Sequence, residues 1–203
     1  LPAGPSEVLV IADKTANPQF CAADLLSQAE HGTDSQVIFI ATDENIFNET
    51  LKEIEKQVAE LPRNEIAKSA LENSRFILMN SVEEALEMSN YYAPEHLILS
   101  VENPRTFLSK INNAGSVFLG NYTPESAGDY ASGTNHTLPT NGFARNYSGV
   151  SLDSFVKKIT IQEISKAGIQ NIGKTIEVMA EAEGLTAHKN AVSLRLKSLE
   201  NGI

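Results

Sequence analysis

The sequence is poor in cysteine, tryptophan and positive charge, and it contains no long apolar run. Of its 203 residues one is cysteine and none is tryptophan, and 16 Lys and Arg stand against 26 Asp and Glu. The one cysteine, Cys21, cannot form an internal disulfide. Because no apolar stretch approaches the roughly 20 residues that cross a bilayer, we expect no membrane role.

The charge and the single cysteine also limit the expected partners and compartment. A formal net charge of −10 repels phosphate backbones, and no basic stripe with interleaved aromatics is present, so we expect no nucleic-acid partner. The N-terminus lacks the basic, apolar and small-residue order of a signal peptide, which favours a reducing cytoplasm. The chain opens at Leu1 without methionine and enters strand-like sequence at once, which suggests a fragment or a processed product.

Motifs for nucleotide binding and for nucleophilic catalysis are missing as well. Neither a Gly-x-Gly-x-x-Gly turn nor a Walker loop occurs, so dinucleotide binding cannot be derived from these residues. Ser126, Ser132 and Ser148 lack a Gly-x-Ser-x-Gly elbow, and Cys21 lies among alanines of a predicted helix, where a buried inert thiol is expected. Without a His-Glu-x-x-His or paired Cys-x-x-Cys motif, any zinc site must be assembled from distant segments.

Short β-branched apolar runs alternate with helical patterns over the first 120 residues. The runs predict strands at Glu7–Ala12, Gln36–Ala41, Arg75–Met79, His96–Val101 and Ser116–Leu119. The patterns between them predict helices at Pro18–His31, Glu44–Leu61, Glu65–Asn73, Val82–Tyr92 and Pro104–Ala114. Because parallel neighbours need crossover connections, this order predicts an α/β fold with a mainly parallel sheet flanked by helices, an incomplete Rossmann-like arrangement.

The pattern changes after residue 120. Residues 121–149 are rich in Gly, Ser, Thr, Asn, Pro and Tyr, and such a long stretch is usually functional or disordered. Helical periodicity returns at Leu152–Lys158, at Ile169–Ala182 and at about Thr186–Leu199. We therefore predict an α/β domain over residues 1–149 and a small helical C-terminal appendage over residues 150–203.

Four histidines occur, and each stands beside reactive or turn-forming residues: His31, His96, His136 and His188. Asp24, Gln28 and His31 share one face of the first predicted helix, at i, i+4 and i+7. That stripe is either a solvated face whose histidine favours the helix dipole, or part of a cation site at the negative end of the helix.

Two further polar groups have both a structural and a chemical interpretation. Glu95 and His96 lie where a predicted helix is followed by a strand, and they form either a general acid/base pair or a strand entry with exposed side chains. Asp129 and His136 lie in the long polar stretch, whose glycines permit close approach of a ligand. The alternative for that stretch is a mobile loop.

Five blocks in order resemble the histidinol dehydrogenase family. They read PAGPSEVLV (residues 2–10), DLLSQAEHG (24–32), APEHL (93–97), ESAGDYASGTNH (125–136) and EAEGLTAHKNA (181–191). The resemblance runs from Leu1 to about Arg195. It implies an NAD-dependent enzyme that oxidises L-histidinol through histidinaldehyde to L-histidine, in the last steps of histidine biosynthesis.

The resemblance also implies the site residues and the cofactors. One Zn²⁺ per subunit is expected on Gln28, His31, Asp129 and His188, a donor set that suits zinc with open positions for substrate nitrogens. His96 is expected to take the alcohol proton, and Glu95 to help activate the water that adds to the aldehyde. The expected substrate contacts are Ser6, Gln28, His31, His96, Asp129, His136, Glu183 and His188.

A homodimer is implied too, in which residues 150–203 form a dimerisation tail. The tail is expected to reach over the partner, so that Glu183 and His188 complete the other subunit's site. Family chains are about twice this long, and most NAD contacts are expected in the segment before Leu1. Two alternatives follow: a non-catalytic fragment that binds zinc and imidazole ligands, and a hydrolase using zinc-bound water, which nothing positive supports.

Overall fold

The structure is a computed structural model that describes residues 2–201. Its contacts divide the chain into two compact units, Leu1–Val156 and Lys157–Ile203. Within the described part, no helix combines the length and the apolar character that a membrane span requires.

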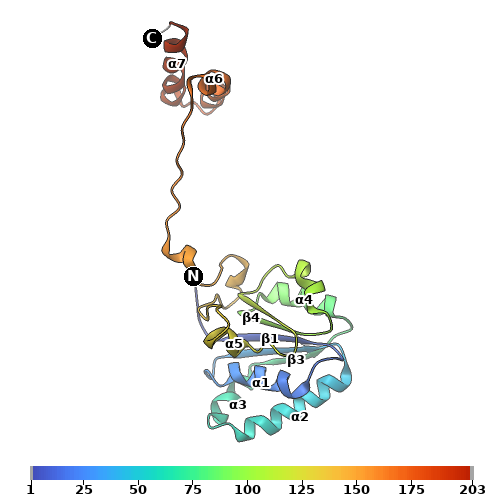
Figure 1. The fold of residues 1–203 in the computed structure, drawn as a ribbon. Coiled ribbons are helices and arrows are strands. Elements are labelled where there is room, and N and C mark those ends of the chain that lie inside the picture. Colours follow the sequence, from blue (N-terminus) through green and yellow to red (C-terminus); the bar gives the residue numbers. More distant parts are fainter. Residues whose placement is uncertain (1, 202–203) are drawn as a thin grey trace. The chain divides into compact units, whose positions relative to one another are not determined.

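Among the described residues of the first unit, five parallel strands form one central sheet (Figure 1). The strands are β1 (Glu7–Ala12), β2 (Gln36–Ala41), β3 (Arg75–Leu78), β4 (His96–Ser100) and β5 (Ser116–Leu119). Their order in the sheet is β3-β2-β1-β4-β5, and every pairing is parallel. The predicted α/β fold with a mainly parallel sheet is confirmed.

Helices cover both faces of this sheet (Figure 1). Three lie on one face, α1 (Pro18–Ala29), α2 (Glu44–Glu60) and α3 (Asn64–Glu72), and α4 (Val82–Tyr92) lies on the other. Val8 and Val10 of β1 join the core under the first three helices, whereas Leu9 and Ile11 join the core under α4. Successive strand side chains point to opposite faces, so a run that is buried on both must be apolar throughout.

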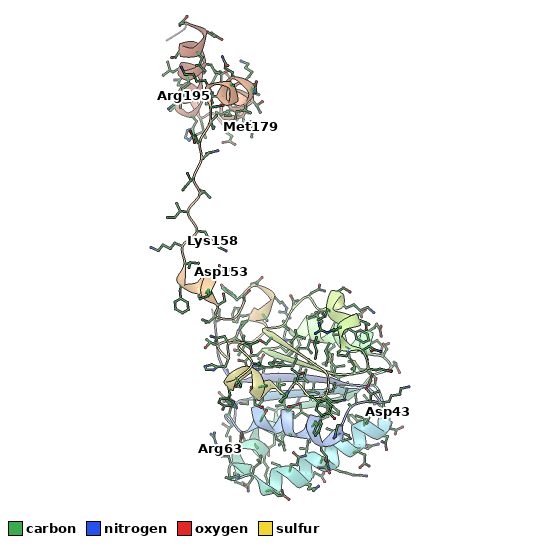
Figure 2. All side chains as sticks on the ribbon, viewed as in Figure 1. Asp43, Arg63, Asp153, Lys158, Met179 and Arg195 are labelled. Atoms are coloured by element: carbon green, nitrogen blue, oxygen red, sulfur yellow. The ribbon has the colours of Figure 1, made fainter. Side chains whose placement is uncertain are left out.

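Two of these helices, α2 and α4, begin at a side chain that caps them. The Asp43 carboxylate accepts the Ile46 N–H at 3.0 Å, and the Ser81 hydroxyl accepts the Glu84 N–H at 3.2 Å. Figure 2 shows Asp43 and Arg63 at opposite ends of α2. The Glu84 carboxylate in turn accepts from the Asn80 N–H at 3.2 Å.

Three predicted segments differ in the structure. Pro104–Ala114 forms only a 3₁₀ helix, η1 (Pro104–Lys110), since the Asn90 side chain accepts the next N–H groups, of Asn112 at 2.7 Å and Asn113 at 3.2 Å. Leu152–Lys158 reduces to η3 (Leu152–Phe155), and residues 156–165 are neither helix nor strand. The polar stretch 121–149 contains a short helix, α5 (Glu125–Tyr130), and η2 (Phe143–Arg145).

The second unit is a pair of packed helices, α6 (Lys166–Ala182) and α7 (Thr186–Glu200). Met179 on α6 and Arg195 on α7 are labelled in Figure 2. The helices approach closely at Gly173, where an added Cβ would lie 2.9 Å from the Leu196 side chain. Gly184 has a φ of +72°, so glycine suits the turn between them.

The strand β5 lies against the backbone that precedes β4. The Gly115 N–H donates to the Pro94 carbonyl and the Ser116 N–H donates to the Glu95 carbonyl, both at 2.9 Å. A Cβ at Gly115 would lie 2.5 Å from that Glu95 carbonyl oxygen and 3.2 Å from Leu138 Cβ. Only glycine therefore fits beside the backbone that carries Glu95.

We predict that Gly115→Ala lowers the free energy of unfolding by about 1–3 kcal/mol, because a backbone must move to admit the methyl group. Urea unfolding followed by circular dichroism measures the change. Gly32→Ala is the matched control, since the nearest neighbours of its new methyl would be side-chain atoms, with the movable Asp34 carboxylate the closest at 2.7 Å. Equal stability of both variants would contradict the packing argument.

Candidate functional site

Seven of the predicted site residues line one cavity of about 310 Å³ in the first unit. They come from the start of β1, the end of α1, the start of β4, α5 and the loop after it. The seven are Ser6, Gln28, His31, Glu95, His96, Asp129 and His136. Tyr130, which was not predicted, also lines the cavity. Residues far apart in the sequence therefore meet where the N-terminal ends of the strands lie.

The backbone of Glu7 holds both members of the Glu95–His96 pair. Its N–H donates to Glu95 Oε2 at 2.9 Å, and its carbonyl lies 2.9 Å from His96 Nδ1. A carbonyl can only accept, so Nδ1 carries the proton and the neutral ring leaves Nε2 as its basic nitrogen. Glu95 Oε2 and His96 Nδ1 are 3.6 Å apart.

Burial changes the proton affinity of both side chains. Glu95 is 6% exposed and His96 is 4% exposed, so the interpretation of an exposed strand entry is wrong. Burial raises the pKa of Glu95 to about 8, and the nearby carboxylates of Glu7, Glu125 and Asp129 act in the same direction. Burial lowers the pKa of His96, since a charged imidazolium is disfavoured there. Both groups are thus suited to proton transfer near neutral pH.

The end of α1 supplies an unpaired acceptor. Gln28 is 1% exposed, and its Oε1 atom has no hydrogen-bond partner. An unsatisfied buried carbonyl oxygen is costly, so an electropositive ligand would be favourable there. The solvated-face interpretation is wrong for Gln28, whereas Asp24 of the same stripe is not among the cavity-lining residues.

Asp129 lies on α5 rather than in a structureless loop. One turn earlier on α5 is Glu125, which is 2% exposed and accepts a hydrogen bond from the Ser27 hydroxyl at 3.1 Å. Burial raises the pKa of Glu125 to about 7, and the nearby Asp129 carboxyl group acts in the same direction. Glu125 opens the block at residues 125–136 that resembles the family, but it was not predicted as a site residue. Its i, i+4 spacing to Asp129 indicates that the two side chains are neighbours only if this segment is known to be helical.

The donor chemistry at this cavity fits a divalent cation. Gln28, His31 and Asp129 offer an amide oxygen, an imidazole and a carboxylate, and the orphaned Gln28 Oε1 needs a positive partner. A second set overlaps it, because His96, Glu125 and Asp129 have ligand atoms within 4.8 Å of one another. Both sets share Asp129.

Glu183 and His188 lie in the second unit. Glu183 follows the last turn of α6, and His188 lies in the first turn of α7; both are exposed. Their predicted contribution to a partner's cavity stays a prediction.

Comparison with known proteins gives a consistent result. The family profile described as "Histidinol dehydrogenase" matches residues 1–196. A histidinol dehydrogenase of Bacteroides thetaiotaomicron is 62% identical over 200 residues, which cover 98% of this chain and 47% of the relative. A histidinol dehydrogenase of Haemophilus influenzae is 58% identical over 199 residues, which cover 98% of this chain and 47% of the relative.

A solved structure agrees as well. The crystal structure of histidinol dehydrogenase from Elizabethkingia anophelis matches with a TM-score of 0.96 and 68% identity, covering 98% of this chain and 46% of that one. The chain thus spans about half the length of the relatives it matches.

We predict that the neutral His96 ring carries its proton on Nδ1 and titrates below pH 6.5, because burial lowers its pKa from that value. Since the pKa is lower in the folded than in the unfolded state, the stability linked to this ring is present above pH 6.5 and is lost as the pH falls through the folded pKa. Nitrogen-15 NMR of the metal-free chain measures both properties. A midpoint above 6.5 would contradict the effect of burial, and a proton on Nε2 would contradict the hydrogen bond to the Glu7 carbonyl.

Proposed function

Because this chain belongs to the histidinol dehydrogenase family, we propose that it supplies the metal-binding and catalytic part of an oxidoreductase that converts L-histidinol to L-histidine through histidinaldehyde. These are the last steps of histidine biosynthesis. The observation that carries the proposal is the meeting of seven predicted site residues at one cavity. These residues come from four separate blocks of the sequence, at residues 2–10, 24–32, 93–97 and 125–136.

We propose that zinc is held by Gln28, His31 and Asp129, with His188 contributed by the partner subunit of a homodimer. The buried, unpaired Gln28 Oε1 supports this set. When bound, zinc would act as a Lewis acid that grips and orients the substrate through its nitrogens. Ser6 and His136 line the same cavity, and with Glu183 they would add hydrogen bonds to the substrate.

The two bases would act in turn. His96 Nε2 takes the alcohol proton in the first oxidation, and the Glu7 carbonyl on Nδ1 stabilises the imidazolium that forms. Glu95 then removes a proton from the water that adds to the aldehyde. With a pKa of about 8, its carboxylate is a stronger base than that of an exposed glutamate.

NAD is the proposed hydride acceptor, and its contacts are expected mainly outside this chain. That expectation rests on the family and on the greater length of the relatives. The same difference in length favours the alternative that the chain alone binds zinc and imidazole ligands without transferring hydride. A cytoplasmic location is proposed from the single cysteine, Cys21, which is buried.

We predict about one zinc per chain in the purified protein, and much less in Gln28→Ala, Asp129→Ala and His188→Ala, since each removes a proposed ligand. Elemental analysis after gel filtration gives the ratio. Glu95→Gln is the matched control, because it alters the same cavity without removing a proposed ligand, and it should keep its zinc. Equal loss in all four variants would contradict the division between ligands and base.

We predict that histidinol and NAD together produce reduced nicotinamide, measured by its absorbance. Glu95→Gln should slow the second oxidation far more than the first, so that histidinaldehyde accumulates, because only the second oxidation needs an activated water. Zinc binding without any reduced nicotinamide would favour the binding-only alternative. Equal slowing of both oxidations would argue against the role of Glu95.

A further inference from the structure

A second group of potential metal ligands lies beside the proposed zinc site. Ligand atoms of His96, Glu125 and Asp129 are all within 4.8 Å of one another. His96 is the first residue of β4, and the two carboxylates are one turn apart on α5. Helix α5 is in contact with α1 and lies near it in Figure 1. Asp129 belongs both to this group and to the ligand set proposed above.

One oxygen of the Glu125 carboxyl group is in use and the other is not. The Ser27 hydroxyl donates to Oε2 at 3.1 Å. Oε1 is buried and has no hydrogen-bond partner among the described residues, and the residue as a whole is 2% exposed. An unpaired buried oxygen is costly, so a positive ion beside it would be favourable.

The imidazole of His96 offers one nitrogen to the same group. Its Nδ1 carries a proton toward the Glu7 carbonyl, 2.9 Å away, so the lone pair of the neutral ring is on Nε2. Histidines that bind metals usually donate their other ring N–H to a carbonyl or a carboxylate, because that contact fixes the ring and its tautomer. The Glu7 contact therefore leaves Nε2 available to a cation as well as to a proton.

The donor set suits a divalent cation such as Zn²⁺. Imidazole nitrogens and carboxylate oxygens bind zinc at about 2.1 Å, so two ligand atoms of one ion lie at most about 4.2 Å apart. The three atoms of this group, within 4.8 Å, need to approach by less than about 1 Å. Two carboxylates balance the charge of the ion. Asp129 has two oxygens and can hold one ion with each, as carboxylates do in sites where two ions are about 3.5–4 Å apart.

We propose that His96, Glu125 and Asp129 form a second, weaker zinc site, and that zinc bound there inhibits the enzyme. The site itself needs only these side chains, whereas the inhibition rests on the function proposed above. A cation on His96 Nε2 occupies the lone pair that would accept the alcohol proton. The site is the weaker of the two because a neighbouring ion on Asp129 repels the second one.

Titration calorimetry of the metal-free full chain with zinc chloride tests the site. The unmutated chain should bind two equivalents, the second more weakly. Glu125→Ala should weaken the second equivalent by at least the roughly 10- to 100-fold that follows the loss of a residue next to a ligand, and Gln28→Ala should weaken the first. Glu60→Gln removes an exposed carboxylate of α2 and is the matched control for charge, so it should change neither.

A second variant and a second measurement guard against misfolding. Glu125→Gln keeps the shape of the side chain and replaces a carboxylate by a weaker amide ligand, so it should weaken the same equivalent to a smaller extent. In nitrogen-15 NMR spectra, the His96 Nε2 signal should move with the second equivalent and not with the first, while Nδ1 keeps its proton. An Nε2 signal that stays in place while the second equivalent binds would overturn the site.

The calorimetry separates this proposal from the zinc site proposed above. If no equivalent depends on Glu125, or if Glu125→Ala weakens the first equivalent instead of the second, the second site is overturned. If Gln28→Ala keeps both equivalents, the site proposed above fails, and an equivalent that still depends on Glu125 would support this one.

The inhibitory role is measured by the absorbance of reduced nicotinamide. Zinc beyond one equivalent should slow the first oxidation, and Glu125→Gln should raise the zinc concentration at half inhibition about tenfold. The same half-inhibiting concentration in both proteins would overturn the inhibition by this site.

Discussion

The two hydrogen bonds of the Glu7 backbone are the interaction on which the site depends. They join the first residue of β1 to the residues that open β4, two strands that lie side by side at the centre of the sheet. The parallel register sets this geometry, and side-chain packing maintains it. Since Glu7 contributes main-chain atoms of β1, the sheet itself holds the Glu95 and His96 side chains in place.

The position of the cavity fits the cation that we propose for it. In doubly wound sheets, ligands usually bind at the carboxyl ends of the strands, where helices begin and phosphates meet free N–H groups. Here Asp13 closes that end of β1 by accepting from the N–H groups of Thr15 and Glu102, both at 2.8 Å. The cavity lies at the opposite edge, beside the end of α1, where the helix dipole is negative.

The sheet could be predicted from sequence because its strands are short apolar runs buried on both faces. The sequence predictions were wrong for Pro104–Ala114 and for the α5 segment, because long-range contacts determine the structure of both. The Asn90 side chain determines where the first segment ends, and the packing of Glu125 against α1 determines the second. No spacing rule brings Ser6, Gln28, Glu95 and Asp129 together. Only the family resemblance did so, and it omitted Glu125, whose partners are visible only after folding.

The crowding of acidic groups beneath the cavity has a further consequence. Glu7, Glu95 and Glu125 are buried together near Asp129, and Gln28 adds an acceptor with no donor. Buried acceptors without a positive partner destabilise the folded protein, so the cation proposed for this cavity would add its binding free energy to folding. In a cell the lifetime of this protein would then follow the supply of metal, and scarcity would reduce its abundance as well as its activity.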